Sequence, residues 1–279
     1  MIIIDFNQVM ISNLMMQLGN HTNIPVDEGL FRHMVLNSLR SYKQQFGNKF
    51  GDMVIACDDR NYWRKQSFPY YKANRKKTRD ASEINWTHVF EVFNKIKSEL
   101  REFFPYRVIQ IESAEADDII ATLVQNSDSH EEILILSGDK DYIQLHKYSY
   151  IKQYDPTRKK WIAHNDPVKY LFEHICKGDS SDGIPNILSD ADTFVSGKRQ
   201  KPLTQKKIDE LYSNFDAKHQ YDVAYERNKQ LIDLTMIPKH IKEQVLSKYE
   251  EEEGKDRSKI FNYFIKYKLK NLMENVGEF

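Results

Sequence analysis

Short apolar runs alternate with helix-length amphipathic segments over the first 160 or so residues. Strand-like runs occupy residues 2–4, 53–57, 107–111 and 133–136, and helical patterns occupy residues 27–46, 84–104 and 116–125. Residues 147–163, with Asp155-Pro156 in the middle, predict a hairpin or an irregular pair of strands. Alternation of strands and helices indicates an α/β fold, with a mainly parallel central sheet and helices on both faces.

The pattern changes after about residue 165, where helices dominate. Helical segments are predicted at residues 167–176, 204–214, 221–234, 238–249 and 257–275, with Thr204 and Pro238 as start signals and Gly254 as a break. A basic loop spans residues 196–202. We therefore expect an α/β core over residues 1–165 and an all-helical C-terminal region over residues 166–279.

Composition excludes several classes of protein. The chain has 279 residues, of which 12% are aromatic, and this content is too high for a disordered chain. Two cysteines exclude a disulfide scaffold. No apolar run approaches the ~20 residues of a membrane span, and the first residues lack a basic leader. We expect a cytoplasmic protein.

The charges balance at 41 basic and 41 acidic side chains, but they are segregated. Residues 60–79 hold eight Lys or Arg and no acid, and aromatic residues are interleaved with them. Such a segment suits phosphate neutralisation and stacking on unpaired bases. A solvated loop is the alternative, but the segment directly follows Asp58, which lies in the acidic pattern described next.

Acidic residues follow each predicted strand of the core. Because the carboxyl ends of parallel strands lie along one edge of the sheet, where ligands bind, we expect these side chains to lie close together there. They are Asp5 after the first strand, Asp58 and Asp59 after the second, Glu115, Asp117 and Asp118 after the third, and Asp139 and Asp141 after the fourth.

Helical periodicity ranks the acids of the third group. Residues 116, 119, 120 and 123 form an apolar stripe, which Glu115 and Asp117 flank, whereas Asp118 points furthest from it. We therefore expect Glu115 and Asp117 to face the site, and Asp59 and Asp118 to be supporting or surface residues.

A further pair, Asp179 and Asp182, lies in a tight Gly/Pro-bounded loop. Carboxylates crowded into one cleft repel each other and require cations. Oxygen ligands with no His or Cys pairing nearby favour Mg²⁺ or Mn²⁺ over Zn²⁺. Two such ions suit in-line attack on a phosphodiester.

Four sequence blocks resemble the metal-dependent 5′-nucleases, which include flap endonucleases and the 5′-nuclease domains of bacterial DNA polymerases. The blocks are Tyr-Lys-Ala-Asn-Arg at 71–75, Ala-Glu-Ala-Asp-Asp at 114–118, Ser-Gly-Asp-Lys-Asp at 137–141 and Gly-Asp-Ser-Ser-Asp-Gly-Ile-Pro at 178–185. Residues 62–64, 227–238 and 277–279 are also similar to the ribonuclease H branch of T-even-type phages.

The resemblance implies a PIN-like 5′-nuclease core, a basic arch-like segment at 60–80, and a C-terminal duplex-binding region with an atypical helix-hairpin-helix. The family's glycine-rich hairpin is the main departure, because residues 186–207 contain one glycine, Gly197. Side chains in and after this segment are expected to replace its grip on duplex phosphates: Lys198, Arg199, Lys201, Lys206 and Lys207.

The resemblance also implies a site with two Mg²⁺ ions, for which Mn²⁺ can substitute. One ion is expected around Asp5, Asp58, Glu115, Asp117 and Asp139, and a second towards Asp141, Asp179 and Asp182. Arg64, Lys72 and Arg75 are expected to hold the scissile phosphate. Tyr62 or Tyr71 is expected to stack on a frayed base, and Lys76 to contact nucleic acid.

The implied activity is 5′ to 3′ hydrolysis of phosphodiesters in RNA–DNA and DNA duplexes and at 5′ flaps, with removal of RNA primers during phage DNA replication in the host cytoplasm. The enzyme is expected to be a monomer that does not bind a membrane. A single-stranded-DNA-binding replication protein is the suggested partner. The alternatives are a PIN-type single-strand ribonuclease and a non-catalytic DNA-binding module. A small-molecule phosphatase is disfavoured, since residues 5–7 offer no second acid.

Overall fold

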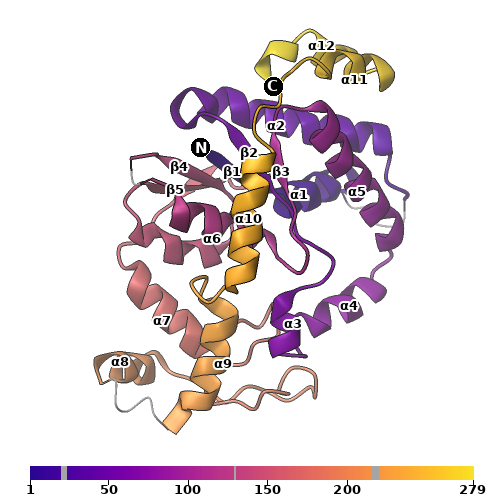
Figure 1. Cartoon of the computed structure of the whole chain (residues 1–279). Coiled ribbons are helices and arrows are strands. Elements are labelled where there is room, and N and C mark those ends of the chain that lie inside the picture. Colours follow the sequence, from indigo (N-terminus) through magenta and orange to yellow (C-terminus); the bar gives the residue numbers. More distant parts are fainter. Residues whose placement is uncertain (20–23, 129, 215–219) are drawn as a thin grey trace.

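A computed structural model describes residues 1–19, 24–128, 130–214 and 220–279, and its centre is a six-stranded sheet (Figure 1). The strands run in the order β3-β2-β1-β4-β5-β6, with β5 parallel to β4 and β6 antiparallel to β5. Their bounds are β1 Ile2–Asp5, β2 Met53–Ala56, β3 Arg107–Ile109, β4 Ile133–Leu136, β5 Ile151–Asp155 and β6 Lys160–Ile162. The predicted mainly parallel sheet is confirmed, and residues 147–163 contain the predicted hairpin.

Helices cover both faces of the sheet, as predicted. Ile2 and Ile4 point into a core shared with α1 (Phe6–Leu18), α2 (Glu28–Phe50) and α5 (Trp86–Phe103). Ile3 points to the other face, which packs against α6 (Ala116–Asn126) and α10 (Lys239–Glu251). Alternate side chains of β1 thus pack into two different hydrophobic cores.

Helix α1 was not predicted, because nothing in the sequence separates it from the strand before it. Asp5 is both the last residue of β1 and the N-cap of α1, where its side chain accepts a hydrogen bond from the Gln8 backbone N–H. The chain therefore turns from strand to helix without a linker.

The basic segment forms two short helices, α3 (Trp63–Ser67) and α4 (Ala73–Asp80). Helix α4 has no buried residue and stands away from the sheet, leading into α5 (Figure 1). In contrast, Phe68 and Tyr71 are buried in a third core with residues from α7, α8 and α9. The segment is thus anchored at 68–71 and exposed beyond it.

The C-terminal region is helical, as predicted. It contains α7 (Pro167–Lys177), α8 (Gln205–Ser213), α9 (Asp222–Ile232), α10, α11 (Ile260–Lys266) and α12 (Lys270–Met273). The prediction of one helix over 257–275 was wrong, because Lys268 adopts a left-handed φ of 56° and separates α11 from α12. Two 3₁₀ helices, η1 (Lys140–Lys147) and η3 (Val276–Glu278), were not predicted.

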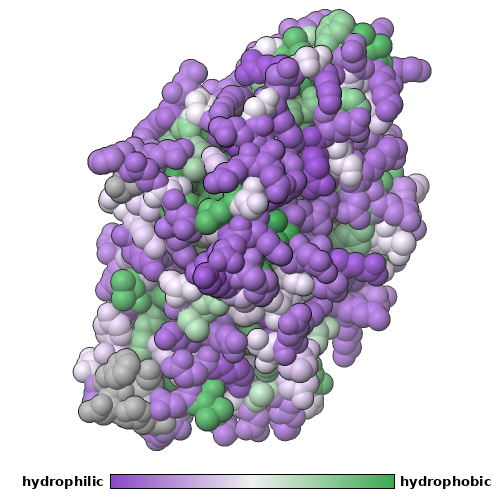
Figure 2. All heavy atoms as spheres, in the orientation of Figure 1, coloured by the Kyte–Doolittle hydropathy of each residue, from purple (hydrophilic) through white to green (hydrophobic). Residues whose placement is uncertain are grey.

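The long segment between α7 and α8 folds back on itself. The Asn186 side chain donates to the Lys201 carbonyl (2.8 Å), and the Asn186 N–H donates to the Gln200 side chain (2.7 Å). These contacts hold residues 200 and 201 of the predicted basic loop against Asn186, which follows the Asp179–Asp182 loop. No helix among the described residues is long and apolar enough to cross a bilayer. The face in Figure 2 is mostly hydrophilic, with scattered apolar patches.

Candidate metal and phosphate site

The first group of carboxylates lies at the carboxyl ends of three adjacent strands. Asp5 ends β1, Asp58 follows β2, and Asp139 follows β4, while Asp117 projects from the first turn of α6. Burial and the neighbouring Asp58 raise the pKa of Asp5 to about 7, and burial and Asp139 raise the pKa of Asp117. The structure therefore brings these four side chains into one electrostatic group, as the strand order requires.

Side-chain donors hydrogen-bond three of these carboxylates and orient them. Asn7 donates to Asp58 (2.5 Å), and Tyr142 donates its phenolic O–H to Asp117 (2.5 Å). Ser137 donates to Asp5 (3.0 Å). These donors were not predicted. Tyr142 follows the second Asp of the 137–141 block directly, and this spacing was the only local signal for it.

The second group lies around Asp141, Asp179 and Asp182. Glycines with left-handed φ angles bound the acidic loop, Gly178 at 67° and Gly183 at 76°. A side chain at Gly178 would clash with the Ile184 carbonyl at 2.3 Å. Together with Asp117, the three carboxylates line one small hollow. Burial and the charge of Asp139 raise the pKa of Asp141 to about 7, so the first and second groups of carboxylates interact electrostatically.

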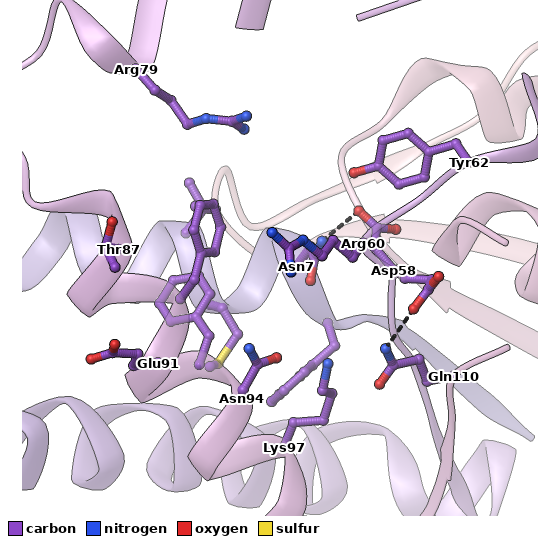
Figure 3. A pocket seen from close by; sticks show the side chains of 16 residues that line it. Asn7, Asp58, Arg60, Tyr62, Arg79, Thr87, Glu91, Asn94, Lys97 and Gln110 are labelled. Atoms are coloured by element: carbon purple, nitrogen blue, oxygen red, sulfur yellow. Dashed lines mark hydrogen bonds between the residues drawn. The ribbon is translucent and has the colours of Figure 1, made fainter. Parts of the chain in front are cut away.

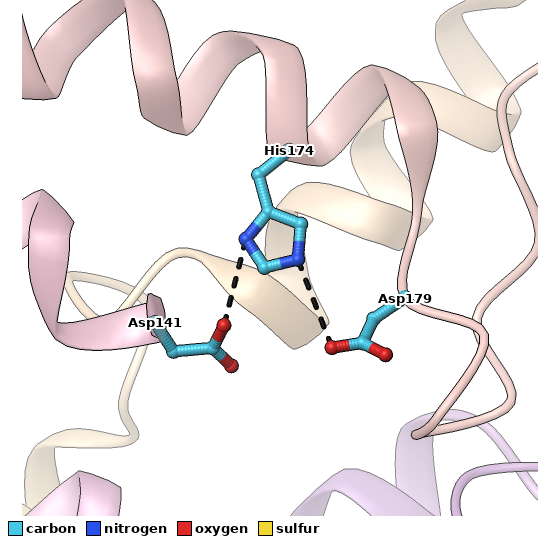
Figure 4. Close-up of side chains that lie close together, drawn as sticks. All are labelled: Asp141, His174 and Asp179. Atoms are coloured by element: carbon cyan, nitrogen blue, oxygen red, sulfur yellow. Dashed lines mark ion pairs between the residues drawn. The ribbon is translucent and has the colours of Figure 1, made fainter. Parts of the chain in front are cut away.

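His174 lies between the carboxylates of the second group, against our expectation that no histidine would be near (Figure 4). Its Nδ1 is 3.6 Å from Asp141 and its Nε2 is 3.7 Å from Asp179. Burial lowers the pKa of His174, but the two carboxylates outweigh burial and raise it. The missed signal was its position, five residues before Asp179 on a helix leading into the acidic loop.

Glu115 is held by cations and a phenol. Lys72 and Arg64 both pair with it, Arg64 at 2.8 Å, and the Tyr71 O–H donates to it at 2.9 Å. Burial raises the pKa of Glu115, yet Lys72 and Arg64 outweigh burial and lower it. Protein groups therefore already neutralise Glu115, and Arg75 does the same in part for Asp182.

Arg64 does not lie where a phosphate contact was expected. Its side chain is 2% exposed and pairs with Glu115 and Asp118, each at 2.8 Å, while its Nε donates to the Leu231 carbonyl at 2.9 Å. A guanidinium so enclosed has no surface to offer to a substrate. Arg64 instead joins α3 to α6 and α9.

Tyr71 and Asp118 lie deeper in the structure than surface contacts would. Tyr71 is buried, and its O–H bridges Glu115 and Asp182 (3.0 Å to the latter), so its ring does not stack on a base. Asp118, expected to be a supporting or a surface residue, is fully buried and has a supporting position: it accepts from the Trp63 indole (3.0 Å) and from the Glu115 N–H (2.9 Å). Periodicity placed Asp118 away from the apolar stripe and gave no sign that α3 covers it.

Lys72 and Arg75 face the carboxylates from the basic segment. The Lys72 ammonium pairs with Glu115 and lies 3.5 Å from Asp182, and its backbone N–H donates to the Asp182 carbonyl at 2.7 Å. Arg75 pairs with Asp182 at 2.6 Å, and 45% of its side chain remains exposed. Lys72 is therefore enclosed among the acidic groups, with 8% of its side chain exposed, and Arg75 lies between them and solvent.

A cavity of about 690 Å³ adjoins Asp58 between α1, α4 and α5 (Figure 3). Apolar walls from Phe6, Met10 and Phe90 meet the cationic side chains of Arg60, Arg79 and Lys97, and Tyr62 lines the same space. Tyr62 thus stays available for stacking. The remaining basic candidates lie at or near the surface: Lys76, Lys198, Arg199, Lys201 and Lys206 are exposed and Lys207 is half-buried.

Two family models match the chain. Residues 2–172 match the "5′-3′ exonuclease, N-terminal resolvase-like domain", and residues 168–279 match "T4 RNase H, C terminal". The chain belongs to the 5′-3′ exonuclease family. It is a hydrolase of the nuclease class, and the resemblance found in the sequence is confirmed.

Known members of this family match over different shares of the chain. Ribonuclease H of Enterobacteria phage T4 is 31% identical over 292 residues, which cover 99% of this chain and 95% of that protein. DNA polymerase I of Caldicellulosiruptor bescii is 27% identical over 72% of this chain, but only 23% of the polymerase is covered.

Two solved structures of the phage T5 D15 protein share the fold. The protein co-crystallised with metal ions superposes with a TM-score of 0.65 at 15% identity, over 91% of this chain and 99% of that one. The D15 flap endonuclease in a pseudo-enzyme–product complex with DNA and metal ions gives a TM-score of 0.64 at 16% identity, over 90% and 98%. Both confirm the predicted α/β fold with its helical C-terminal region.

Proposed function

We propose that this chain is a Mg²⁺-dependent 5′ to 3′ nuclease that hydrolyses phosphodiesters in RNA–DNA and DNA duplexes and at 5′ flaps. The observation that carries the proposal is the convergence of acids from four segments of the core and from the Asp179–Asp182 loop on one edge of the sheet. The T4 relative is a ribonuclease H, and D15 structures contain metal ions and DNA, which supports this choice of chemistry.

The residues present fit divalent ions. Burial and mutual repulsion raise the pKa values of Asp5 and Asp141 to about 7, so a cation is needed to offset their charge. Asp5, Asp58, Asp117 and Asp139 would hold one ion, and Asp141, Asp179 and Asp182 a second. Mg²⁺ keeps several waters, which suits the wider first group, and Mn²⁺ can substitute. When bound, such ions activate water and stabilise the leaving oxygen.

The protein's own cations complete the site. Lys72 and Arg75 would release part of their pairing with Asp182 to hold the scissile phosphate and to neutralise charge in the transition state. The buried pair of Glu115 and Arg64 would hold α3, α6 and α9 together beneath the site. This assignment replaces the phosphate role expected of Arg64.

The cavity beside Asp58 would receive the unpaired end of the substrate. Its volume of about 690 Å³ is within the ~300–1,000 Å³ that ligand pockets usually have, and its lining combines aromatic faces with three cations. Tyr62 would stack on a base there, and Lys76 would contact the strand at its entrance. The exposed Lys198, Arg199, Lys201, Lys206 and the neighbouring Lys207 would contact the duplex.

The physiological role that fits this activity is removal of RNA primers during phage DNA replication in the host cytoplasm. In this proposal residues 1–165 form the nuclease core and residues 166–279 bind duplex. The protein acts as a monomer, and a single-stranded-DNA-binding replication protein would be its partner. The high identity and coverage with the phage T4 ribonuclease H support this role.

Cleavage of a 5′-labelled RNA–DNA hybrid tests the proposal. We expect short 5′ products with Mg²⁺ and none with a chelator. Asp139→Asn and Asp182→Asn should each lower the single-turnover rate at least ~100-fold, while the Kd for the hybrid changes less than ~5-fold, since ligands for catalytic ions act mainly on the chemical step.

Asp52→Asn is the matched control, because Asp52 lies at the opposite end of β2 and its side chain is 82% exposed. Its rate should equal that of the wild type. Full activity of both site variants, or activity in the chelator, would contradict the proposal. DNA binding without any cleavage would favour the non-catalytic module instead.

A further inference from the structure

The second acidic group contains a nitrogen donor that an oxygen-only metal site does not require. Among the described residues, Asp141, His174 and Asp179 are the one set of three acidic, His or Cys side chains whose donor atoms all lie within 4.8 Å of one another. Ligand bonds of about 2.0–2.2 Å place two ligands of one ion about 3–4.5 Å apart. The set is therefore close to the size that a single ion needs.

One nitrogen of the His174 imidazole lacks a hydrogen-bond partner in the part of the chain that the structure describes. The Nδ1 atom is buried without a hydrogen-bond partner among the described residues, and both ring nitrogens face carboxylates at 3.6 and 3.7 Å (Figure 4). Buried polar atoms almost always have a partner, so the unpartnered Nδ1 atom that faces Asp141 points to a ligand at that place.

The fold holds the ring there firmly. His174 lies on the last turn of α7, which packs along η1, and η1 carries Asp141. The Gly178 N–H donates a hydrogen bond to the His174 carbonyl at 2.8 Å and ends the helix there. Asp179 is the next residue in the chain. Three ligands thus come from a helix, the start of a 3₁₀ helix and a glycine-bounded loop.

We propose that His174 binds the second metal ion through one ring nitrogen, together with Asp141 and Asp179, and that this position prefers Mn²⁺ to Mg²⁺. The other ring nitrogen donates to the remaining carboxylate oxygen, as metal-bound histidines usually do. Imidazole suits transition-metal ions, whereas Mg²⁺ selects oxygen ligands. The inference rests on the proposed metal-dependent activity and makes the two positions chemically unequal.

Electron paramagnetic resonance of bound Mn²⁺ tests the inference without measuring cleavage. The wild-type protein should show electron spin-echo modulation from a directly bonded ¹⁴N atom. In His174→Gln this modulation should disappear, and Mn²⁺ affinity at one of two positions should fall about tenfold or more, the range for altered metal sites. Mg²⁺ affinity should change less than about threefold.

His146→Gln is the matched control, because His146 hydrogen-bonds Gln153 at 2.9 Å on the far part of η1. It should keep the nitrogen signal and the Mn²⁺ affinity, and circular dichroism should show that both variants are folded. Mn²⁺ binding with no nitrogen signal in the wild type would overturn the role of His174 and leave the nuclease proposal standing. Binding of neither ion would overturn both.

Discussion

At the scale of single residues, buried charge explains both the expectations that held and those that failed. Acids after strands could be found from the sequence, because strand ends and acidic residues are both local patterns. Their partners could not, since Arg64 and Tyr71 reach Glu115 across more than 40 positions of the chain. Basic and aromatic residues near a cleft looked like substrate contacts, and the structure shows two of them supporting carboxylates.

Buried acids that are held ionised should destabilise the metal-free protein. The pKa of Asp5 is raised from 3.8 to about 7, so the stability that its protonation contributes is fully present below about pH 4 and is lost as the pH rises through about 7. In a chelator at pH 8, Asp5→Asn should therefore unfold at a higher temperature than the wild type. The gain should be of the order of 1–4 kcal/mol, or several degrees, and smaller at pH 5.

Differential scanning calorimetry at the two pH values measures this effect. Asp52→Asn should show no such pH-dependent gain, because Asp52 is exposed. If Asp5→Asn melted at or below the wild-type temperature at pH 8, the charge of Asp5 would not destabilise the metal-free protein.

At the scale of elements, the basic segment and the acidic loop are joined at one backbone contact. The Lys72 N–H donates to the Asp182 carbonyl, and Lys72 itself has a left-handed φ of 55°. A methyl group at Gly183 would lie 2.9 Å from the Tyr70 carbonyl. The positions of Lys72 and Asp182 are thus set together, although 110 residues separate them.

Gly183→Ala should therefore disturb catalysis as well as stability. We expect a loss of at least ~2 kcal/mol in unfolding free energy and a cleavage rate at least ~10-fold lower, since the added methyl group would press against a backbone carbonyl and move both loops. Urea unfolding and single-turnover cleavage measure the two effects.

Gly197→Ala provides a matched comparison, because Gly197 has a similar φ of 70° and nothing within 4 Å of an added methyl group. It should show only the backbone cost of about 1 kcal/mol and an unchanged rate. Equal losses in the two variants would show that the contact with Tyr70 has no role in catalysis.

At the scale of the whole molecule, most of the fold could be predicted and most of the packing could not. Short apolar runs predicted the strands, and helical patterns predicted the majority of the helices. The break at Lys268 and the strand-to-helix step at Asp5 depend on single backbone angles, which these patterns do not contain. The third core, which joins Phe68 and Tyr71 to α7, α8 and α9, depends on contacts more than 100 residues apart.

The central claim is that acids from the core and from the Asp179–Asp182 loop hold two divalent ions at separate positions. Isothermal titration with Mn²⁺ tests it most directly. The account predicts two ions per wild-type chain, loss of one position in Asp117→Asn, and loss of the other in Asp179→Asn. A single ion in the wild type, or loss of the same position in both variants, would contradict it.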